Sequence, residues 1–241
     1  MVAVIAQLPR WDREESDDDK LRRMELNPEK LRTILRVARA GTNEHTPADA
    51  PGFPGTDNYN TIIKLLTLAT RDGSFPGWRR SDDHNQPLFV HDRGIDGRGM
   101  HILVSASNPG GARKGAYSTT KNDKGEATRR RIDESLRGQP PVQPSLFTLT
   151  QNSDSGESSS IPLWFLLYEI GEDGTCCASL KYVTGYKRRG DGQPSYFPIF
   201  DGEQISIIDE KDEGPLPDDY TGIPDQGIDP ADSAISITRK E

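Results

Sequence analysis

The sequence contains very little cysteine. Only two of its 241 residues are cysteines, and Cys176 and Cys177 are adjacent. Neighbouring cysteines form a strained disulfide, and the pair has neither the C-x-x-C spacing nor the second pair that a zinc site needs. The sequence therefore argues against a disulfide-rich secreted domain and against a cysteine zinc site, and we expect two reduced thiols in the cytosol.

Long apolar runs are also missing. No stretch of 18 apolar residues is present, so no transmembrane helix is predicted, and residues 1–9 lack the basic start and long apolar stretch of a signal peptide. Only 32% of the residues are hydrophobic, and 18 prolines and 23 glycines interrupt them. These features predict a loop-rich cytoplasmic protein with one large domain and no membrane contact.

Charge is not spread evenly along the chain. The net charge is −8, but residues 201–241 alone hold twelve acidic side chains against three basic ones. The first 200 residues are therefore nearly neutral, and within them 111–137 has eight basic residues against four acidic ones. Because binding responds to the local field, the total charge does not exclude a nucleic-acid partner.

Turn-forming residues divide the chain into three parts. We expect a polar extension or an irregular first helix over residues 1–26 and a single α+β domain over 27–208. An acidic, proline-rich tail follows over 209–241, and within it 235–237 alternates like a final strand.

Two helices are predicted early in the domain. The first has Asn27 as its N-cap, Pro28 in its first turn and Gly41 at its end, with apolar residues at helical spacing between them. The second covers residues 59–70, with a cap at Asp57 or Asn58.

Short apolar runs between turns predict strands in the rest of the domain. The predicted strands are 87–90, 100–104, 145–149, 161–170, 176–183, 197–200 and 204–208. The runs 161–170 and 176–183 read as a hairpin, because an Asp-Gly pair lies near the turn between them. The predicted fold class is α+β, mainly β, with two flanking helices.

The sequence shows no catalytic constellation. Its four histidines lack metal-binding spacing, and neither a G-x-S-x-G elbow nor a P-loop is present. Asp209, Glu210 and Lys211 have the residue types of a magnesium nuclease, but such triplets arise often by chance in an acidic tail. We therefore expect no metal, no cofactor and no catalytic residue in this chain, and leave open whether it is part of an enzyme.

The segment 111–137 is the most informative part of the sequence. It mixes lysine and arginine with serine, threonine, asparagine and glycine, which are residue types that contact phosphates and base edges. A second interpretation is a solvated loop and helix whose cations pair with Asp123, Glu126, Asp133 and Glu134. A further basic run, 187–189, is expected at a hairpin tip, where it reaches a nucleic-acid backbone if it lies on the same face.

Three stretches carry a resemblance to a known family. They are residues 40–45, a Gly/Thr/His loop after a helix; 116–132, a Tyr-bearing strand, a Lys/Gly turn and a Thr-Arg run; and 164–183, a strand pair with an acidic turn. In this order they resemble the two recognition arms and the following strands of the N-terminal effector domain of EcoRII-type restriction endonucleases. The resemblance spans roughly residues 35–185 and implies a DNA-binding pseudobarrel, although the family's apolar strand ending in proline is not found.

This resemblance implies a site as well as a fold. It implies a recognition domain that binds double-stranded DNA in the major groove with two arms, 41–46 and 111–131. By analogy, Thr42 lies in the first arm, and the residues that read bases are Asn43, His45, Lys121, Arg129 and Arg130. The residues that contact phosphates are Arg113, Lys114, Lys124 and Arg131. The implied function is sequence-specific DNA binding in a restriction or defence system.

The alternative function is a protein-interaction or regulatory domain of a phage or defence system, without direct DNA binding. In that case the basic segment and the acidic tail serve a protein partner or each other, and the tail covers a basic cleft by resembling nucleic acid.

Overall fold

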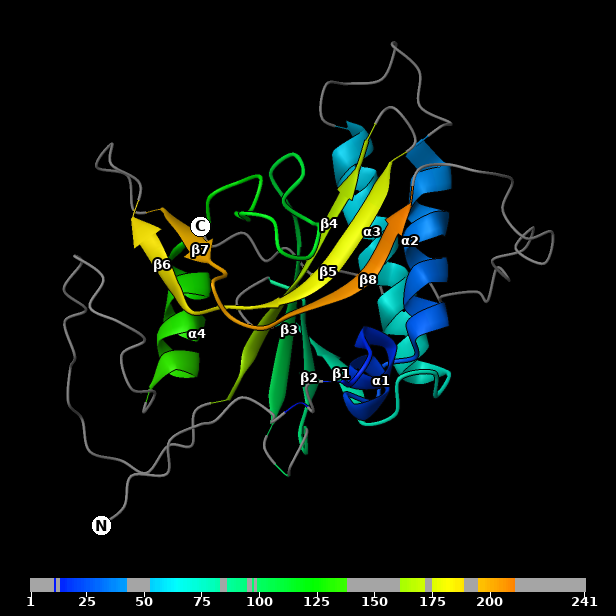
Figure 1. Cartoon of the computed structure of the whole chain (residues 1–241), viewed down its shortest axis with the longest axis horizontal. Coiled ribbons are helices and arrows are strands. Elements are labelled where there is room, and N and C mark those ends of the chain that lie inside the picture. Colours follow the sequence, from blue (N-terminus) through cyan, green and yellow to red (C-terminus); the bar gives the residue numbers. More distant parts are fainter. Residues whose placement is uncertain are drawn as a thin grey trace, which may run out of the picture.

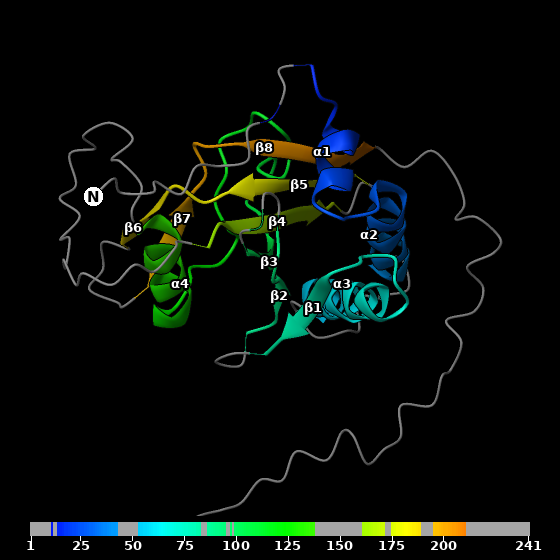
Figure 2. The same cartoon turned by 90° about the horizontal axis from the view of Figure 1, so that it is seen from below.

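Helices cover both faces of an open sheet (Figures 1 and 2). The chain is seen here as a computed structural model, which describes residues 11, 14–42, 53–82, 86–94, 97, 99–137, 161–171, 175–188 and 195–210. The helices within these ranges are α1 (Asp17–Arg23), α2 (Pro28–Thr42), α3 (Phe53–Arg71) and α4 (Glu126–Leu136). The strands are β1 (Trp78–Ser81), β2 (Leu88–His91), β3 (Met100–Ala106), β4 (Leu163–Ile170), β5 (Cys176–Tyr182), β6 (Gly185–Arg188), β7 (Tyr196–Ile199) and β8 (Gln204–Glu210).

The main sheet has six strands in the order β1-β2-β3-β4-β5-β8. Strands β3 and β4 are parallel, and every other neighbouring pair is antiparallel. Strands β6 and β7 form a separate two-stranded sheet. The predicted α+β class is confirmed. The main sheet is open, however, with β1 and β8 at its edges, and does not close into the pseudobarrel that the resemblance implies.

Alternation along the strands creates two cores. On β4, Trp164 and Leu166 pack with α1, α2 and α3, whereas Phe165 and Leu167 pack with Ile132 of α4 on the other face. Successive side chains of a strand point to opposite faces, so a strand that is apolar at every position must be covered on both. Helix α4 and the β6–β7 hairpin therefore lie across the sheet from α1–α3 (Figure 2).

The first predicted helix is confirmed. Asn27 Oδ1 accepts a hydrogen bond from the amide of Lys30 at 3.1 Å, and Pro28 begins α2. The helix ends one residue after Gly41. The second helix is longer than predicted, because α3 starts at Phe53 and contains both residues that were expected to cap it. Proline is tolerated in the first helical turn, where the missing N–H has no partner to lose, so the Phe-Pro pair does not prevent this early start.

Residues 1–26, predicted as a polar extension or an irregular first helix, contain the helix α1, which is part of the fold. Leu21 is fully buried in the core under α2, and Ser16 caps the helix through Asp19 N. This helix also covers the edge of the sheet, because Asp17 Oδ2 accepts from Ser206 N of β8 at 2.9 Å. From α2, Arg32 Nε donates to the carbonyl of Ile207 at 2.9 Å.

Six of the predicted strands are found, as β2, β3, β7, β8 and the two strands of the β4–β5 hairpin. Strands β1 and β6 were not predicted, because their sequences, WRRS and GYKR, are short and charged. The predicted strands 145–149 and 235–237 lie outside the described residues. Within the described ranges, no helix has the length and apolar character needed to cross a membrane.

Candidate functional site

The loop 107–121 crosses the sheet on the side of α4 and carries much of the predicted basic segment (Figure 1). Its two ends are joined, because Asn108 N donates to Thr119 O at 3.0 Å and Asn108 Oδ1 accepts from Thr119 N at 2.7 Å. Its far end reaches β8, where Gly115 N donates to Gln204 Oε1 at 2.7 Å. The loop is therefore bound to the sheet along its length.

Beneath the loop lies a buried lysine, which belongs to none of the motifs in the sequence. Lys181 of β5 is 0% exposed, and its ammonium donates to Arg113 O at 2.6 Å and to Ser118 Oγ at 2.5 Å. Ser179, two residues earlier on the same face, donates to Ala112 O at 2.5 Å. Burial lowers the pKa of Lys181 to about 8. A polar side chain inside an otherwise apolar strand was the available signal for this contact.

Two of the predicted phosphate contacts form ion pairs within the protein. Arg113 Nε lies 3.0 Å from Asp209 Oδ1, and Lys114 Nζ lies 2.7 Å from Asp17 Oδ1. Both cations remain about half exposed. Asp209 also accepts from the thiol of Cys177, whose pKa is raised to about 12, chiefly by burial. A thiol with this pKa stays protonated and is no nucleophile at neutral pH.

The three consecutive arginines of α4 have different surroundings. Arg129 pairs with Glu126 and Asp133, and the arginine holds the pKa of Glu126 down to about 2. Arg131 is 6% exposed and donates to Gln86 Oε1 at 3.0 Å. Arg130 is the exposed member, with 65% of its side chain accessible and only a long contact of 3.7 Å to Glu126. The interpretation of paired cations thus describes part of this helix.

The remaining two lysines of the predicted arm also differ. The backbone of Lys124 pairs with Tyr196 of β7 through hydrogen bonds of 2.7 and 2.9 Å, and burial lowers the pKa of its side chain to about 8. Lys121 is exposed and forms no ion pair with another described residue. Among the predicted contacts that the structure describes, Lys121 and Arg130 are therefore exposed without a short ion pair to another described residue.

Helix α4 packs against strand β6, which brings the second basic run beside the first. Arg129 is the link, since its guanidinium lies 5.7 Å from the ring centre of Tyr196, and Tyr196 in turn contacts Tyr186 edge-on at 5.3 Å. Lys187 and Arg188 follow Tyr186 and are exposed. Arg188 shares a face of β6 with Tyr186 and thus lies near Arg129, nearly sixty positions away in the sequence, whereas Lys187 points to the other face of the strand.

The first predicted arm is only partly described. Thr42 is the last residue of α2, and Asn43 and His45 lie outside the described residues. Helix α2 packs on the face of the sheet opposite to the segment 112–132. The structure therefore places α4 of the second arm beside β6, whereas Arg113 and Lys114 face β8 and α1, and α2 lies on the other face of the sheet.

No other cluster in the described part of the chain has the geometry of an active site. His91 is 3% exposed, its Nε2 lies 2.7 Å from Glu25 Oε2, and its Nδ1 accepts from Gly94 N at 2.6 Å. Both ring nitrogens are thus occupied, so this histidine cannot accept a proton from a substrate without losing a contact. No group of three or more metal-ligating side chains occurs among the described residues.

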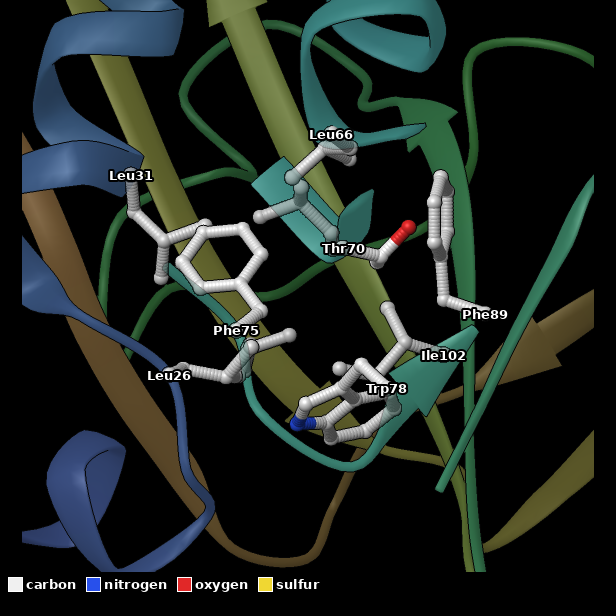
Figure 3. Close-up of a pocket in the computed structure, with 10 residues that line it drawn as sticks. Leu26, Leu31, Leu66, Thr70, Phe75, Trp78, Phe89 and Ile102 are labelled. Carbon is white, nitrogen blue, oxygen red and sulfur yellow. The ribbon is translucent and has the colours of Figure 1, made fainter. Parts of the chain in front are cut away.

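An apolar cavity of about 20 Å³ lies between the helices and the sheet (Figure 3). Leu31, Leu66, Phe75, Trp78 and Phe89 surround it. A cavity of this size holds at most one water, and an apolar lining gives such a water no hydrogen-bond partner. The cavity is a packing defect of the core rather than a ligand site.

Comparison with protein-family models, with curated proteins and with solved structures gives no match to this chain. The function must therefore be inferred from the geometry of the site.

Proposed function

We propose that this protein binds double-stranded DNA as the recognition domain of a restriction or defence system. The binding surface is the basic side, which we define as α4, the β6–β7 hairpin and the loop 107–121. These three elements lie on the same side of the main sheet (Figures 1 and 2). The resemblance to the effector domain of EcoRII-type endonucleases implies the same partner, although the sheet here is open.

The convergence of two basic runs is the observation that carries the proposal. Arg130 on α4 and Lys187 and Arg188 on β6 are exposed on elements that pack together. Like charges on neighbouring elements repel one another, and the phosphates of a polyanion offset this repulsion. The counterions that the polyanion releases on binding favour the complex further. In this arrangement the three cations contact phosphates, and Lys121 extends the binding surface onto the loop 107–121.

Arg129 has a different part in the proposed surface. Its position over Tyr196 joins α4 to the hairpin, and its pairing with Glu126 and Asp133 of the same helix fixes the guanidinium in that position. It acts here as a positioning residue, and base reading by Arg129 and Arg130 stays a prediction. The backbone of Lys124 also joins the start of α4 to the hairpin, because it pairs with the backbone of Tyr196.

The test is the salt dependence of duplex binding, measured by fluorescence anisotropy with a short labelled DNA. Replacing Arg130, Lys187 and Arg188 together by glutamate should abolish binding at moderate salt. Replacing them by glutamine should reduce the slope of log K against log salt by about 3, since each neutralised phosphate contributes about 0.9 for duplex DNA.

A matched control uses three exposed cations far from the basic side. Lys64 and Arg71 lie on α3, and Arg80 of β1 contacts Thr67 of α3. Replacement of these three cations by glutamate changes the net charge by the same amount. The control should bind DNA within a small factor of the unmodified protein. Equal loss in both variants would show that only net charge matters and would refute the surface.

The alternative, a protein-interaction domain without DNA binding, is favoured by one observation. Arg113 and Lys114 pair with Asp209 and Asp17, so part of the basic segment is neutralised within the fold. If the full chain does not bind duplex DNA even at low salt, the proposed function is wrong and the protein-interaction domain is favoured. Either function is proposed for the cytoplasm, where the two buried thiols remain reduced.

A further inference from the structure

Tyr117 is the most exposed large hydrophobic residue in the described part of the chain. Its accessible fraction is 85%, while the next, Leu68 and Ile161, are at 38%. The residues on either side of it are not similarly exposed, since Ser118 is buried and Ala116 is partly covered. A single aromatic side chain therefore projects from a loop whose neighbouring residues are packed down.

The loop that presents Tyr117 is fixed directly beside it. Ser118 Oγ donates to Gly111 O at 2.6 Å and receives a hydrogen bond from the buried Lys181. Lys181 also lies 3.4 Å from the carbonyl of Ala116. The residues that flank the tyrosine in the sequence are thus held to β5 by hydrogen bonds from below, which sets the position of its Cα.

A fixed loop lowers the cost of binding. A ligand that contacts a mobile loop must order the backbone, whereas here the fold has already ordered it. A tyrosine side chain adds only two rotatable torsions, so it offers a large flat surface at a small entropic cost. The position of Tyr117 is therefore suited to contact with a ligand.

The loop that carries Tyr117 is basic. Residues 107–122 contain Arg113, Lys114 and Lys121 and no acidic residue. The acids that face the first two cations, Asp209 and Asp17, come from β8 and α1. Gly115 has a φ of +79° and no side chain, so the backbone next to the ring is open to close approach.

We propose that Tyr117 stacks on an unpaired nucleobase, so that the basic side binds nucleic acid at a single-stranded or flipped-out nucleotide as well as along a duplex. This inference rests on the proposed function and names the form of nucleic acid that the site prefers. Aromatic rings in cationic surroundings stack on bases of any sequence, while the nearby cations contact the phosphates. A paired base inside a duplex does not offer its face, so the contact requires an unpaired one.

The experiment compares three labelled DNAs: a single strand, an unbroken duplex and a duplex with a one-nucleotide bulge. Tyr117→Ala should weaken binding of the single strand and the bulged duplex by roughly 5- to 150-fold, the measured range for one base–aromatic stack. It should leave the unbroken duplex within about twofold, because no face of a paired base is accessible there. Tyr117→Phe keeps the ring and should retain the affinity for all three DNAs.

A second readout reports stacking itself. The fluorescence of 2-aminopurine in the bulge or the single strand is quenched when an aromatic ring stacks on it, so the full-length protein should quench it and the Tyr117→Ala variant should not. Leu68→Ala, on the opposite side of the sheet, removes an exposed apolar side chain and serves as the control. Because both positions are exposed, thermal unfolding should confirm that each variant remains folded.

The outcomes separate this inference from the proposed function. Unchanged binding and unchanged quenching for Tyr117→Ala, together with DNA binding that the triple glutamate variant loses, would refute the stacking and leave the basic side intact. Equal weakening of all three DNAs would also refute stacking, since the tyrosine would then contact the backbone. If the unmodified protein binds none of the three, both the proposed function and this inference fail.

Discussion

The ammonium of Lys181 lies 2.5 Å from Ser118 Oγ, at the place where a loop crosses β5, next to the edge strand β8. This contact is unusual because the lysine is fully buried and its hydrogen-bond acceptors are neutral. A buried cation without a carboxylate partner is costly to keep, so its retention points to a specific task. That task is to hold the loop 107–121 in one position on β5.

Replacing this lysine should release the loop. Lys181→Met leaves the carbonyls of Arg113 and Ala116 and the hydroxyl of Ser118 without their donor, and unpaired buried groups favour local opening. Trypsin cleavage after Lys114 should then be about tenfold faster, which corresponds to the loss of roughly 1.4 kcal/mol of opening free energy. Lys187→Met, in exposed β6, should not change the cleavage rate after Lys114. Equal rates in both variants would contradict the role of Lys181.

The same lysine should give stability a dependence on alkaline pH. Burial lowers its pKa from 10.5 to about 8, so between these values the unfolded chain binds more protons than the folded chain. The free energy of unfolding should therefore rise with pH across this window, by an amount on the order of 2 kcal/mol for this group. Denaturant unfolding at a series of pH values should show the rise in the unmodified protein and its loss in Lys181→Met. Identical pH profiles would exclude this assignment.

His101 should make stability sensitive to acid. It lies on β3, and burial lowers its pKa to about 4, with Arg131 and Arg79 adding to the effect. Below pH 6.5 the imidazole of His101 is therefore protonated in the unfolded chain but not in the folded chain. The free energy of unfolding falls for this reason as the pH drops from 6.5 to 4. His101→Gln should flatten this part of the curve by on the order of 2 kcal/mol. A fall of the same size in both proteins would assign it to other groups.

Neighbouring arginines on α4 should differ in their effect on stability. Arg129→Ala removes two ion pairs and the contact with Tyr196, and we expect a loss of about 1–2 kcal/mol because the side chain is only 27% exposed. Arg130→Ala removes a long contact of an exposed side chain and should be nearly neutral. Thermal unfolding of the two variants measures the difference. A reversed order would contradict the assignment of Arg129 as the positioning residue.

The apolar cavity predicts a strong effect of truncation on α3. Leu66 lines the cavity and is 5% exposed, so Leu66→Ala enlarges an existing void and should cost about 3–5 kcal/mol of stability. Leu68, on the exposed side of the same helix, should cost less than about 1 kcal/mol when replaced by alanine. Denaturant titration of both variants tests this. A small loss for Leu66→Ala would mean that the core collapses around the void.

Much of the fold could be predicted from local sequence patterns. The Asn27 cap, the apolar stripe of α2 and the Asp-Gly hairpin are local signals, and each corresponds to an element in the structure. The start of α3 was placed too late, because two residues suited to capping occur inside the helix. Gly55 and Thr56, which precede these two residues in the helix, are exposed, so burial against the sheet does not explain the early start.

The site was less predictable, because its members come from distant segments. Which acids neutralise Arg113 and Lys114 depends on the approach of β8 and α1, and nothing in the segment 111–137 shows it. Acids within the same helix could be foreseen, and Arg129 does pair with Glu126 and Asp133. The packing of the β6–β7 hairpin on α4 likewise depends on the whole fold, and neither the basic segment 111–137 nor the run 187–189 indicates it.

The side chains that meet β8 have a consequence for association between molecules. An edge strand of seven residues would ordinarily offer its free amides and carbonyls to a strand of another chain. Asp17 occupies the amide of Ser206 and Arg32 the carbonyl of Ile207, so this edge is closed to further strand addition. The acidic start of α1 thus hinders the addition of a strand from another molecule. A chain that lacks residues 1–26 would lose the contact from Asp17 and keep the contact from Arg32.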